Sequence, residues 1–323
     1  MQPFIYPKKL QSGDEIRVIA PAKSFKPSFT EEMKALAIKR LGSLGLKVSF
    51  GKYLNEANEF ESTTVEHRLE DLHDAFRDQN IKAILTVLGG TTSNQLLKYL
   101  DYDLIKNNPK ILCGLSDITS LANAIHARTG LVTYSGPHFT LFGADKQVDY
   151  TMDYFRKCFF SEDTIDIKSS DKFCNNRWDK EEIENDGFWI INHGNAKGTI
   201  IGGNLITLNL LQGSEYMPDL SNSILFLEDN DKESIRAVEN HLQSLIHQPS
   251  FSTVKGIVFG RFQIGTKMTK ELLTKIVKTK KELDNIPVIA NLEFGHTTPM
   301  ITFPIGGECE IDTKNQKIEI IKH

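Results

Sequence analysis

The sequence predicts an α/β protein with two domains, a parallel sheet flanked by helices in the N-terminal half and a mixed sheet in the C-terminal half. The chain has 323 residues, which is enough for two domains with a substantial core in each. Short apolar runs alternate with segments of helical period in the first half, and the alternation resumes after a polar interval. Strand-like alternation near the end of the chain indicates a terminal β-hairpin.

Four apolar runs in the first half have the length of buried strands. They lie at residues 15–21, 47–50, 83–88 and 111–115. The helices expected between and after them lie at residues 28–44, 64–79 and 117–126. Ser28 or Thr30 is suited to cap the first helix, and Gly45 follows its end. Strands that alternate with helices form parallel sheets, so this half is predicted to be a Rossmann-like domain whose functional edge lies at the carboxyl ends of its strands.

The pattern predicts a first domain over residues 1–150, a linker with a surface loop over 151–186, and a second domain over 187–323. The middle segment is polar, acidic and weakly periodic. Strands of the second domain are expected at 187–191, 198–203, 223–230, 254–260 and 287–290, helices at 205–211, 233–245 and 269–283, and the terminal hairpin at 301–311 and 317–321. Asn204 is placed to cap the first of these helices.

Composition excludes several classes of function. A net charge of −4 and a pI near 6.2 argue against a nucleic-acid-binding protein, which needs a basic surface. No run approaches the roughly 18 apolar residues that span a bilayer, and the first residues do not resemble a secretory signal. The four cysteines and nine histidines form no ligand cluster, so we expect neither a disulfide framework nor a metal site, and a cytoplasmic location.

Ser116 lies where a buried strand is expected to turn into a helix. Such a turn exposes a hydroxyl at the edge of the sheet and directs the first backbone N–H groups of the helix at the same point, which suits a nucleophile and an oxyanion. Serine is also a common helix cap, so the turn alone does not distinguish a nucleophile from a capping residue.

Gly89 and Gly90 lie at the same predicted edge, in a loop between a strand and a helix that Ser93 or Asn94 is suited to cap. Glycine lets a ligand approach the backbone closely and exposes N–H groups. Neither the phosphate-loop pattern nor the Gly-x-Gly-x-x-Gly pattern is present, which argues against a nucleotide cofactor. A tight turn without a binding role explains the loop equally well.

A nucleophilic serine needs a base within hydrogen-bond reach and an acid that orients the base. Glu228 ends an apolar strand, and His296 follows Gly295 in a polar loop. His138 and His126 are alternatives for the base, because one lies at the predicted edge of the first sheet and the other late in the helix after Ser116. The residues alone leave this choice open.

Four motifs in order resemble the LD-carboxypeptidase family of serine peptidases, which includes the microcin C immunity proteins. They are Gly-Leu-Ser-Asp at 114–117, Gly-Gly-Asn-Leu at 202–205, Leu-Phe-Leu-Glu-Asp at 225–229 and Phe-Gly-His-Thr at 294–297. The resemblance implies Ser116 as nucleophile, Glu228 as orienting acid and His296 as general base, with the backbone N–H groups of Gly90 and Asp117 as oxyanion donors. It also implies a homodimer that needs no metal or organic cofactor.

The loop at 89–97 is more similar to the microcin C immunity branch than to peptidoglycan LD-carboxypeptidases, although Thr92 replaces an expected Asn. The resemblance implies hydrolysis of an amide bond in a peptidyl or aminoacyl nucleotide. The alternatives are removal of terminal D-alanine from muropeptide tetrapeptides and, in another class, a non-catalytic peptide- or nucleotide-binding protein. Trp178 either packs its loop or stacks on a nucleobase. The candidate substrate-binding residues are Gly89, Thr91, Ser93, Asn94 and Trp178.

Overall fold

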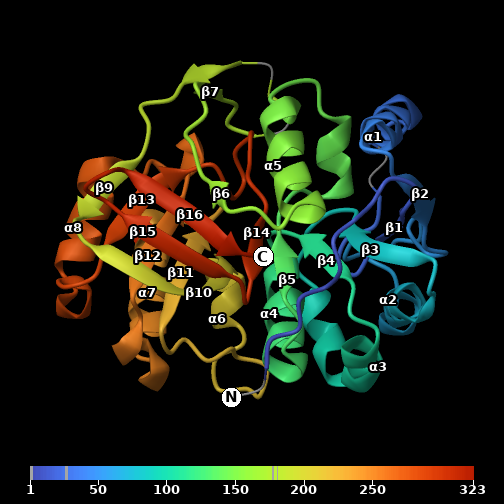
Figure 1. Ribbon diagram of the computed structural model, residues 1–323, viewed down its shortest axis with the longest axis horizontal. Helices are drawn as coiled ribbons and strands as arrows, with labels where there is room; N and C mark the ends of the chain where they lie inside the picture. Colours follow the sequence, from blue (N-terminus) through green and yellow to red (C-terminus); the bar gives the residue numbers. More distant parts are fainter. Residues whose placement is uncertain (1–2, 26–27, 177, 180) are drawn as a thin grey trace.

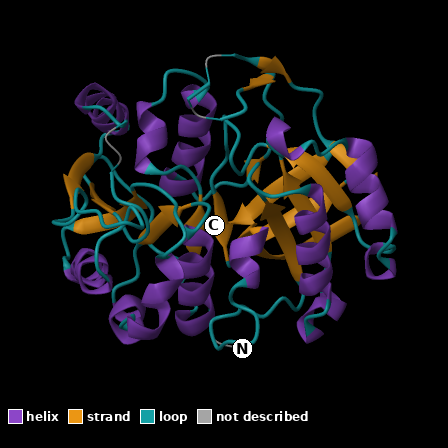
Figure 2. Ribbon diagram, turned by 180° about the vertical axis from the view of Figure 1, so that it is seen from behind, coloured by secondary structure: helices purple, strands orange, loops and turns teal. Residues whose placement is uncertain are grey.

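The computed structural model describes residues 3–25, 28–176, 178–179 and 181–323. Two α/β domains lie side by side, each built on its own sheet (Figure 1). Helices pack around both sheets, as the view from behind shows (Figure 2). The predicted fold class is therefore confirmed: the N-terminal sheet is mostly parallel, the C-terminal sheet is mixed, and the chain ends in antiparallel strands. Among the described residues, no helix is both long and apolar enough to cross a bilayer.

The first sheet has six strands in the order β14-β5-β4-β3-β1-β2. Its members are β1 (Glu15–Ile19), β2 (Lys47–Phe50), β3 (Ile81–Thr86), β4 (Ile111–Gly114), β5 (Thr133–Ser135) and β14 (Phe303–Ile305). The first five run parallel, and β14 joins β5 in the antiparallel direction. Thus a strand from late in the chain forms one edge of the N-terminal sheet.

The helices predicted at residues 28–44, 64–79 and 117–126 are present as α1 (Glu31–Ser43), α2 (Val65–Arg77) and α4 (Ile118–Thr129), and each begins close to its predicted position. The short helix α3 (Tyr102–Asn107) was not predicted. Thr30 caps α1, because its hydroxyl accepts a hydrogen bond from the Met33 N–H. Residues 93–99 form a 3₁₀ helix without a capping side chain, so the predicted cap by Ser93 or Asn94 is wrong. The Ser93 hydroxyl instead donates to the backbone oxygen of Asp117.

The second sheet has eight strands in the order β6-β16-β15-β10-β11-β12-β13-β9. These are β6 (Ile165–Asp166), β9 (Trp189–Asn192), β10 (Asn195–Asn204), β11 (Ser223–Glu228), β12 (Gly256–Gly260), β13 (Val288–Leu292), β15 (Glu308–Asp312) and β16 (Lys317–Lys322). Strands β10 to β13 are parallel and place their carboxyl ends at one edge. The helices are α6 (Leu205–Asn209), α7 (Ile235–Ile246) and α8 (Lys270–Lys278). Asn204 caps α6 as predicted.

The prediction of a linker and surface loop over 151–186 is wrong in its secondary structure. Helix α5 (Val148–Phe160) covers the start of this segment, β6 joins the second sheet, and β7 (Lys172–Phe173) pairs with β8 (Ile183–Glu184). Charged residues on the exposed face of α5 hide its helical pattern, in which Thr151, Tyr154, Phe155 and Phe159 are buried. The segment 301–311, predicted as one strand of the terminal hairpin, forms two strands instead. Strand β14 joins the first sheet, and β15 pairs with β16.

The two domains interlock where α4 meets β10. The Thr119 hydroxyl accepts a hydrogen bond from the Asn204 N–H at 2.9 Å, and the Asn123 amide donates to the Gly202 carbonyl at 2.8 Å. A Cβ atom on Gly203 would lie 2.4 Å from the Thr119 hydroxyl oxygen, so only glycine permits this approach. The interface fixes the start of α4, where Ser116 lies, against the carboxyl edge of the second sheet.

Candidate active site

Ser116 occupies the sharp turn between β4 and α4. Its φ angle is +63°, in the left-handed region that is unfavourable for residues with a side chain. This backbone presents the hydroxyl at the carboxyl edge of the first sheet. The interpretation of Ser116 as a simple cap does not hold, because Asp117 occupies the N-cap position of α4 and the Ser116 hydroxyl lies next to a histidine instead.

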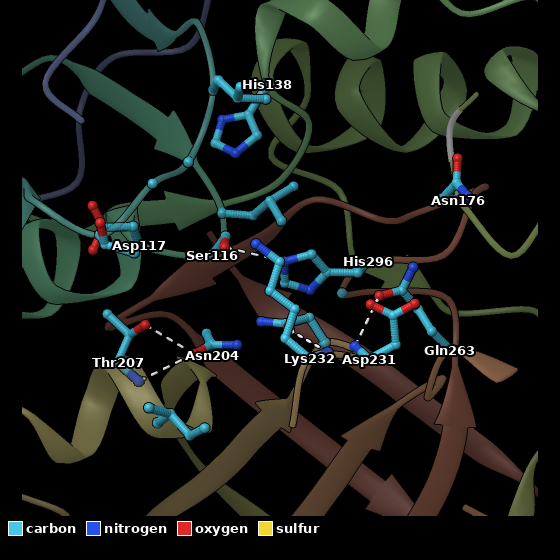
Figure 3. A pocket seen from close by; sticks show the side chains of 18 of the residues that line it. Ser116, Asp117, His138, Asn176, Asn204, Thr207, Asp231, Lys232, Gln263 and His296 are labelled. Atoms are coloured by element: carbon cyan, nitrogen blue, oxygen red, sulfur yellow. Dashed lines mark hydrogen bonds between the residues drawn. The ribbon is translucent and has the colours of Figure 1, made fainter. Parts of the chain in front are cut away.

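That histidine is His296. Its Nε2 atom lies 3.1 Å from the Ser116 Oγ atom (Figure 3). Its Nδ1 atom lies 2.7 Å from the Glu228 Oε2 atom. Glu228 ends β11 and is buried. Gly295 has a φ angle of +103°, and a Cβ atom there would lie 2.8 Å from Glu228 Oε2. Glycine before His296 is therefore what lets the loop pass close enough to place the imidazole between the two side chains.

The two alternative histidines have different surroundings. His126 is buried late in α4, where its Nδ1 atom contacts the Leu131 carbonyl at 3.0 Å and its ring packs edge-on against Phe4. It does not line the site. His138 does line the site, and its Nδ1 atom lies 2.8 Å from the Thr86 hydroxyl oxygen. His296 is therefore the histidine that contacts the Ser116 hydroxyl.

The glycine loop is held against the start of α4 by Asp117. Its Oδ2 atom accepts the N–H groups of Thr92 and Ser93 at 2.9 and 2.8 Å. Burial raises the pKa of the Asp117 carboxyl, and these two hydrogen bonds oppose the rise. Gly89, Gly90 and Thr91 consequently border the site together with Asp117. Ser93 is buried behind the loop and Asn94 faces away, so neither lines the cavity.

A cavity of about 540 Å³ opens beside these groups, between the two domains. Its lining includes the apolar side chains of Leu88, Leu115 and Leu141. It also carries charges of both signs: Lys232 and Lys23, which is paired with Glu61, and the carboxyl groups of Asp231 and Glu233. Trp178 borders the cavity with 43% of its surface exposed, and its ring centre lies 6.4 Å from that of Phe29. The cavity therefore combines apolar side chains, charged groups of both signs and an indole at its rim.

Several lining residues were not predicted as site residues. Those with polar side chains include Lys23, Asn176, Asn204, Lys232 and Gln263. Asn204 was recognised as a helix cap and as part of a family motif but not as a site residue, although it pairs in register with Glu228 across β10 and β11. Its position at the end of a parallel strand, beside the strand that carries Glu228, is the signal that would have identified it. The others come from loops, and no sequence pattern predicts that these loops meet at the cavity. In the described part of the chain, no group of His, Cys, Asp or Glu is arranged to hold a metal ion.

Asp229 is a second buried carboxyl beside Glu228. Its Oδ1 atom accepts the Asn204 side-chain N–H at 3.2 Å and the Asn230 backbone N–H at 2.9 Å. Burial raises the pKa of Asp229 from its ordinary value of 3.8 to about 7, and the neighbouring Glu228 adds to the rise. The folded state therefore keeps a proton between about pH 4 and 7 that the unfolded chain has lost.

This difference gives a prediction for stability. Because the folded state binds more protons than the unfolded state in this window, Asp229 lowers stability as the pH rises from about 4 to 7. Asp229→Asn removes the ionisation, so the variant should gain stability relative to the wild type at pH 8 but not at pH 4, by about 1.4 kcal/mol for each unit of pKa shift at most. Urea unfolding at both pH values measures this. The same difference between the two proteins at pH 4 and pH 8 would contradict it.

The fold and this arrangement are those of a serine hydrolase with its site between two α/β domains. Residues 16–136 match the family model for the LD-carboxypeptidase N-terminal domain, and residues 197–311 match that for the C-terminal domain. The chain belongs to the LD-carboxypeptidase family of serine peptidases.

Its relatives include proteins classed as carboxypeptidases and proteins of the microcin immunity type. YocD of Bacillus subtilis, classed with the carboxypeptidases, is 50% identical over 99% of this chain and 100% of its own. The crystal structure of an MccF-like protein from Bacillus anthracis is 48% identical, with a TM-score of 0.95 over 99% of this chain and 100% of that one. The microcin self-immunity protein MccF, solved with glutamyl sulfamoyl guanosine, is 30% identical, with a TM-score of 0.88 over 98% of both chains. A B. subtilis protein classed as a murein peptide carboxypeptidase is also 30% identical, over 95% of this chain and 91% of its own.

Proposed function

We propose that this protein is an amide hydrolase in which Ser116, His296 and Glu228 form the catalytic triad. The observation that supports it is the line of contacts from Ser116 Oγ through the imidazole to Glu228. His296 Nε2 takes the hydroxyl proton as Oγ attacks the amide carbonyl carbon, and Glu228 stabilises the imidazolium. The N–H groups of Gly90 and Asp117 receive the oxyanion.

The remaining steps complete the reaction without a cofactor. His296 returns the proton to the leaving nitrogen, the C–N bond breaks, and Ser116 is left as an ester of the acyl group. Water then attacks this ester with His296 again accepting the proton, which releases a carboxylic acid and restores the serine. In this proposal the nucleophile belongs to a domain over residues 1–150, and the acid and base belong to one over 187–323.

For the substrate we propose a peptidyl or aminoacyl nucleotide. The structure of MccF is similar to that of this chain, with a TM-score of 0.88. MccF has been solved with aspartyl sulfamoyl adenosine and with glutamyl sulfamoyl guanosine. In this chain Trp178 offers an indole face at the rim of the cavity, and Lys232 offers positive charge for the linking group. A cytoplasmic homodimer is part of the same proposal.

A second candidate is an LD-carboxypeptidase that removes terminal D-alanine from muropeptides. Lys232 favours it as well, because a carboxypeptidase must neutralise the terminal carboxylate of its substrate. The kinship with a murein peptide carboxypeptidase is consistent with this alternative.

A mass-spectrometric assay separates the candidates. The purified protein is offered an L,D-linked tetrapeptide and an aminoacyl-sulfamoyl adenosine, with Ser116→Ala as control. We expect cleavage of the nucleotide conjugate, and loss of all turnover in Ser116→Ala with binding kept. Release of D-alanine alone would favour the second candidate. Binding without turnover by the wild type would indicate a non-catalytic binding protein, and turnover by Ser116→Ala would refute the serine mechanism.

A further inference from the structure

Arg68 is a buried arginine to which the proposed mechanism gives no role. It lies near the start of α2, and its exposed fraction is 3%. Arginine is rarely buried unless its five N–H donors find partners. Within the described chain, the hydrogen bonds of its side chain all end on neutral oxygen atoms. Burying a cation among neutral groups is costly, so the segments that supply these oxygens indicate what Arg68 holds in place.

Two segments that flank the glycine loop, residues 89–91, share the guanidinium of Arg68. On the segment after the loop, Arg68 Nη1 donates to the Thr92 carbonyl at 2.9 Å and to the Thr92 hydroxyl oxygen at 3.0 Å. On the segment after β1, the same nitrogen donates to the Pro21 carbonyl at 3.3 Å. Nη2 donates to Gln95 Oε1 at 2.7 Å. Arg68 therefore joins two stretches of backbone that are far apart in the sequence.

The segment 21–23 is the surface on which the glycine loop lies. A Cβ atom on Gly90 would lie 3.1 Å from the Lys23 backbone nitrogen and 3.2 Å from Ala22 Cβ. The Lys23 N–H also donates to the Gly89 carbonyl at 3.2 Å. Because no side chain of Gly90 separates the two stretches of backbone, a shift of segment 21–23 would move the Gly90 peptide with it.

A second set of hydrogen bonds connects the same two segments. The Thr92 hydroxyl donates to Ser62 Oγ at 3.3 Å, and the Ser62 hydroxyl donates to the Ala22 carbonyl at 2.6 Å. These bonds are compatible with the contact from Arg68, because a hydroxyl can accept from the guanidinium while it donates to Ser62. The Thr92 side chain thus takes part in both connections.

Asp117 holds Thr92 from the opposite side. Its Oδ2 atom accepts the N–H groups of Thr92 and Ser93, while Arg68 binds the Thr92 carbonyl. Burial raises the pKa of the Asp117 carboxyl, and the positive charge of Arg68 is among the interactions that oppose this rise. A buried cation and a buried anion therefore act on the same residue, three positions before which the glycine loop begins.

The proposed oxyanion donors, the N–H groups of Gly90 and Asp117, depend on this arrangement. The loop also packs closely against the nucleophile, since a Cβ atom on Gly89 would lie 2.8 Å from Ser116 Cβ. Adjacent glycines have little conformational preference of their own, so surrounding contacts must fix the direction of the Gly90 N–H. An oxyanion donor is effective only when it points at the position of the developing charge.

We propose that Arg68 is a positioning residue for the oxyanion-binding groups. By holding residues 21 and 92 on either side of the glycine loop, it fixes the Gly90 N–H relative to Ser116. This role rests on the proposed hydrolysis by Ser116. Arg68 acts through the loop and not on the substrate, since it is absent from the described residues that line the cavity.

Arg68→Met tests the role on an aminoacyl-sulfamoyl adenosine. It should lower kcat about 10- to 100-fold with little change in KM, because only the transition state carries the oxyanion and a displaced group can cost about 10²-fold. Thr92→Val, which keeps the backbone and removes the hydroxyl, should give a smaller loss of the same kind. An α-aminoboronic acid provides a second readout, because its tetrahedral adduct with Ser116 carries an oxygen at the oxyanion position. Its inhibition constant should rise in parallel with the loss in kcat.

Lys110 provides the matched control for lost stability. It is also a buried cation that binds backbone oxygens, the carbonyls of Ala75 and Asp78 at the other end of α2. It precedes β4, whereas Ser116 follows that strand, so the two lie at opposite edges of the sheet. Lys110→Met should lower the midpoint of urea unfolding, as Arg68→Met does, while kcat and the inhibition constant stay near those of the wild type.

Each further outcome has a distinct meaning. A loss of kcat in Arg68→Met no larger than in Lys110→Met would mean that Arg68 only supports the fold. A rise in KM with unchanged kcat and inhibition constant would mean that it shapes substrate binding instead. Either result overturns the positioning role while the proposed function stands. If Arg68→Met does not fold, unchanged kcat and inhibition constant in Thr92→Val overturn the role. Failure of the wild type to cleave any conjugate would overturn the proposed function and the positioning role together.

Discussion

Glu228→Gln is expected to lower kcat by about 10²- to 10⁴-fold with little change in KM. Glu228 Oε2 accepts a hydrogen bond from His296 Nδ1 at 2.7 Å, which holds the tautomer whose Nε2 can accept the Ser116 proton. A neutral amide removes the charge that stabilises the imidazolium and permits the wrong tautomer. Steady-state kinetics on whichever conjugate the wild type cleaves would measure this effect.

Asp229 provides the matched control, because Asp229→Asn makes the same chemical change one residue further along the chain. This carboxyl contacts Asn204 and Asn230 and has no hydrogen bond with His296 among the contacts of the described residues. We expect its replacement to cost less than about tenfold in kcat, since an amide oxygen can keep both hydrogen bonds. Equal losses in the two variants would show that negative charge near the site matters and that orientation of His296 by Glu228 does not.

Arg261→Met is expected to destabilise the protein by about 3–5 kcal/mol, the usual effect of leaving one buried charge without its partner. Arg261 Nη2 lies 2.7 Å from Glu293 Oε1, and the two side chains are 3% and 0% exposed. The guanidinium also covers the Phe173 ring at 4.5 Å. Chemical denaturation at neutral pH would report the loss as a lower midpoint at unchanged slope.

Arg261→Met should also disturb the active site, because Glu293 connects the loop that carries His296 to the segment that carries Trp178. Its Oε1 atom accepts hydrogen bonds from the Ser170 N–H and the Asn185 side chain, which lie at the base of the segment that carries Trp178. The double variant Arg261→Met, Glu293→Met removes both charges and should recover much of the stability. A double variant as unstable as the sum of the single ones would mean that the two residues do not act as a pair.

Local sequence patterns were sufficient where local physics decides the structure. The strands β1 to β4 and the caps at Thr30 and Asn204 were predicted because apolar runs and capping hydroxyl or amide groups act over a few residues. Helix α5 was missed because its exposed charges dominate the composition of the segment. Strand β14 was assigned to the wrong partner because its pairing with β5 joins residues far apart in the sequence.

The site shows the same division between local and long-range information. The turn at Ser116 was visible as a strand followed by a helix, although its positive φ angle was not. His296 lies 180 residues from Ser116, and nothing in the spacing distinguished it from His138; only the family resemblance did. Asn176, Lys232 and Gln263 reach the cavity from loops, where tertiary packing alone determines which side chains converge.

The place of β14 has a consequence for how the protein is made. Residues 303–305 complete the first sheet along β5, so a ribosome must translate nearly the whole second domain before the nucleophile-bearing sheet acquires its last edge. Until then the β5 edge offers unpaired N–H and C=O groups to any other chain nearby. Expression of residues 1–150 alone should therefore give aggregation-prone material, and co-expression of the two halves should rescue its solubility.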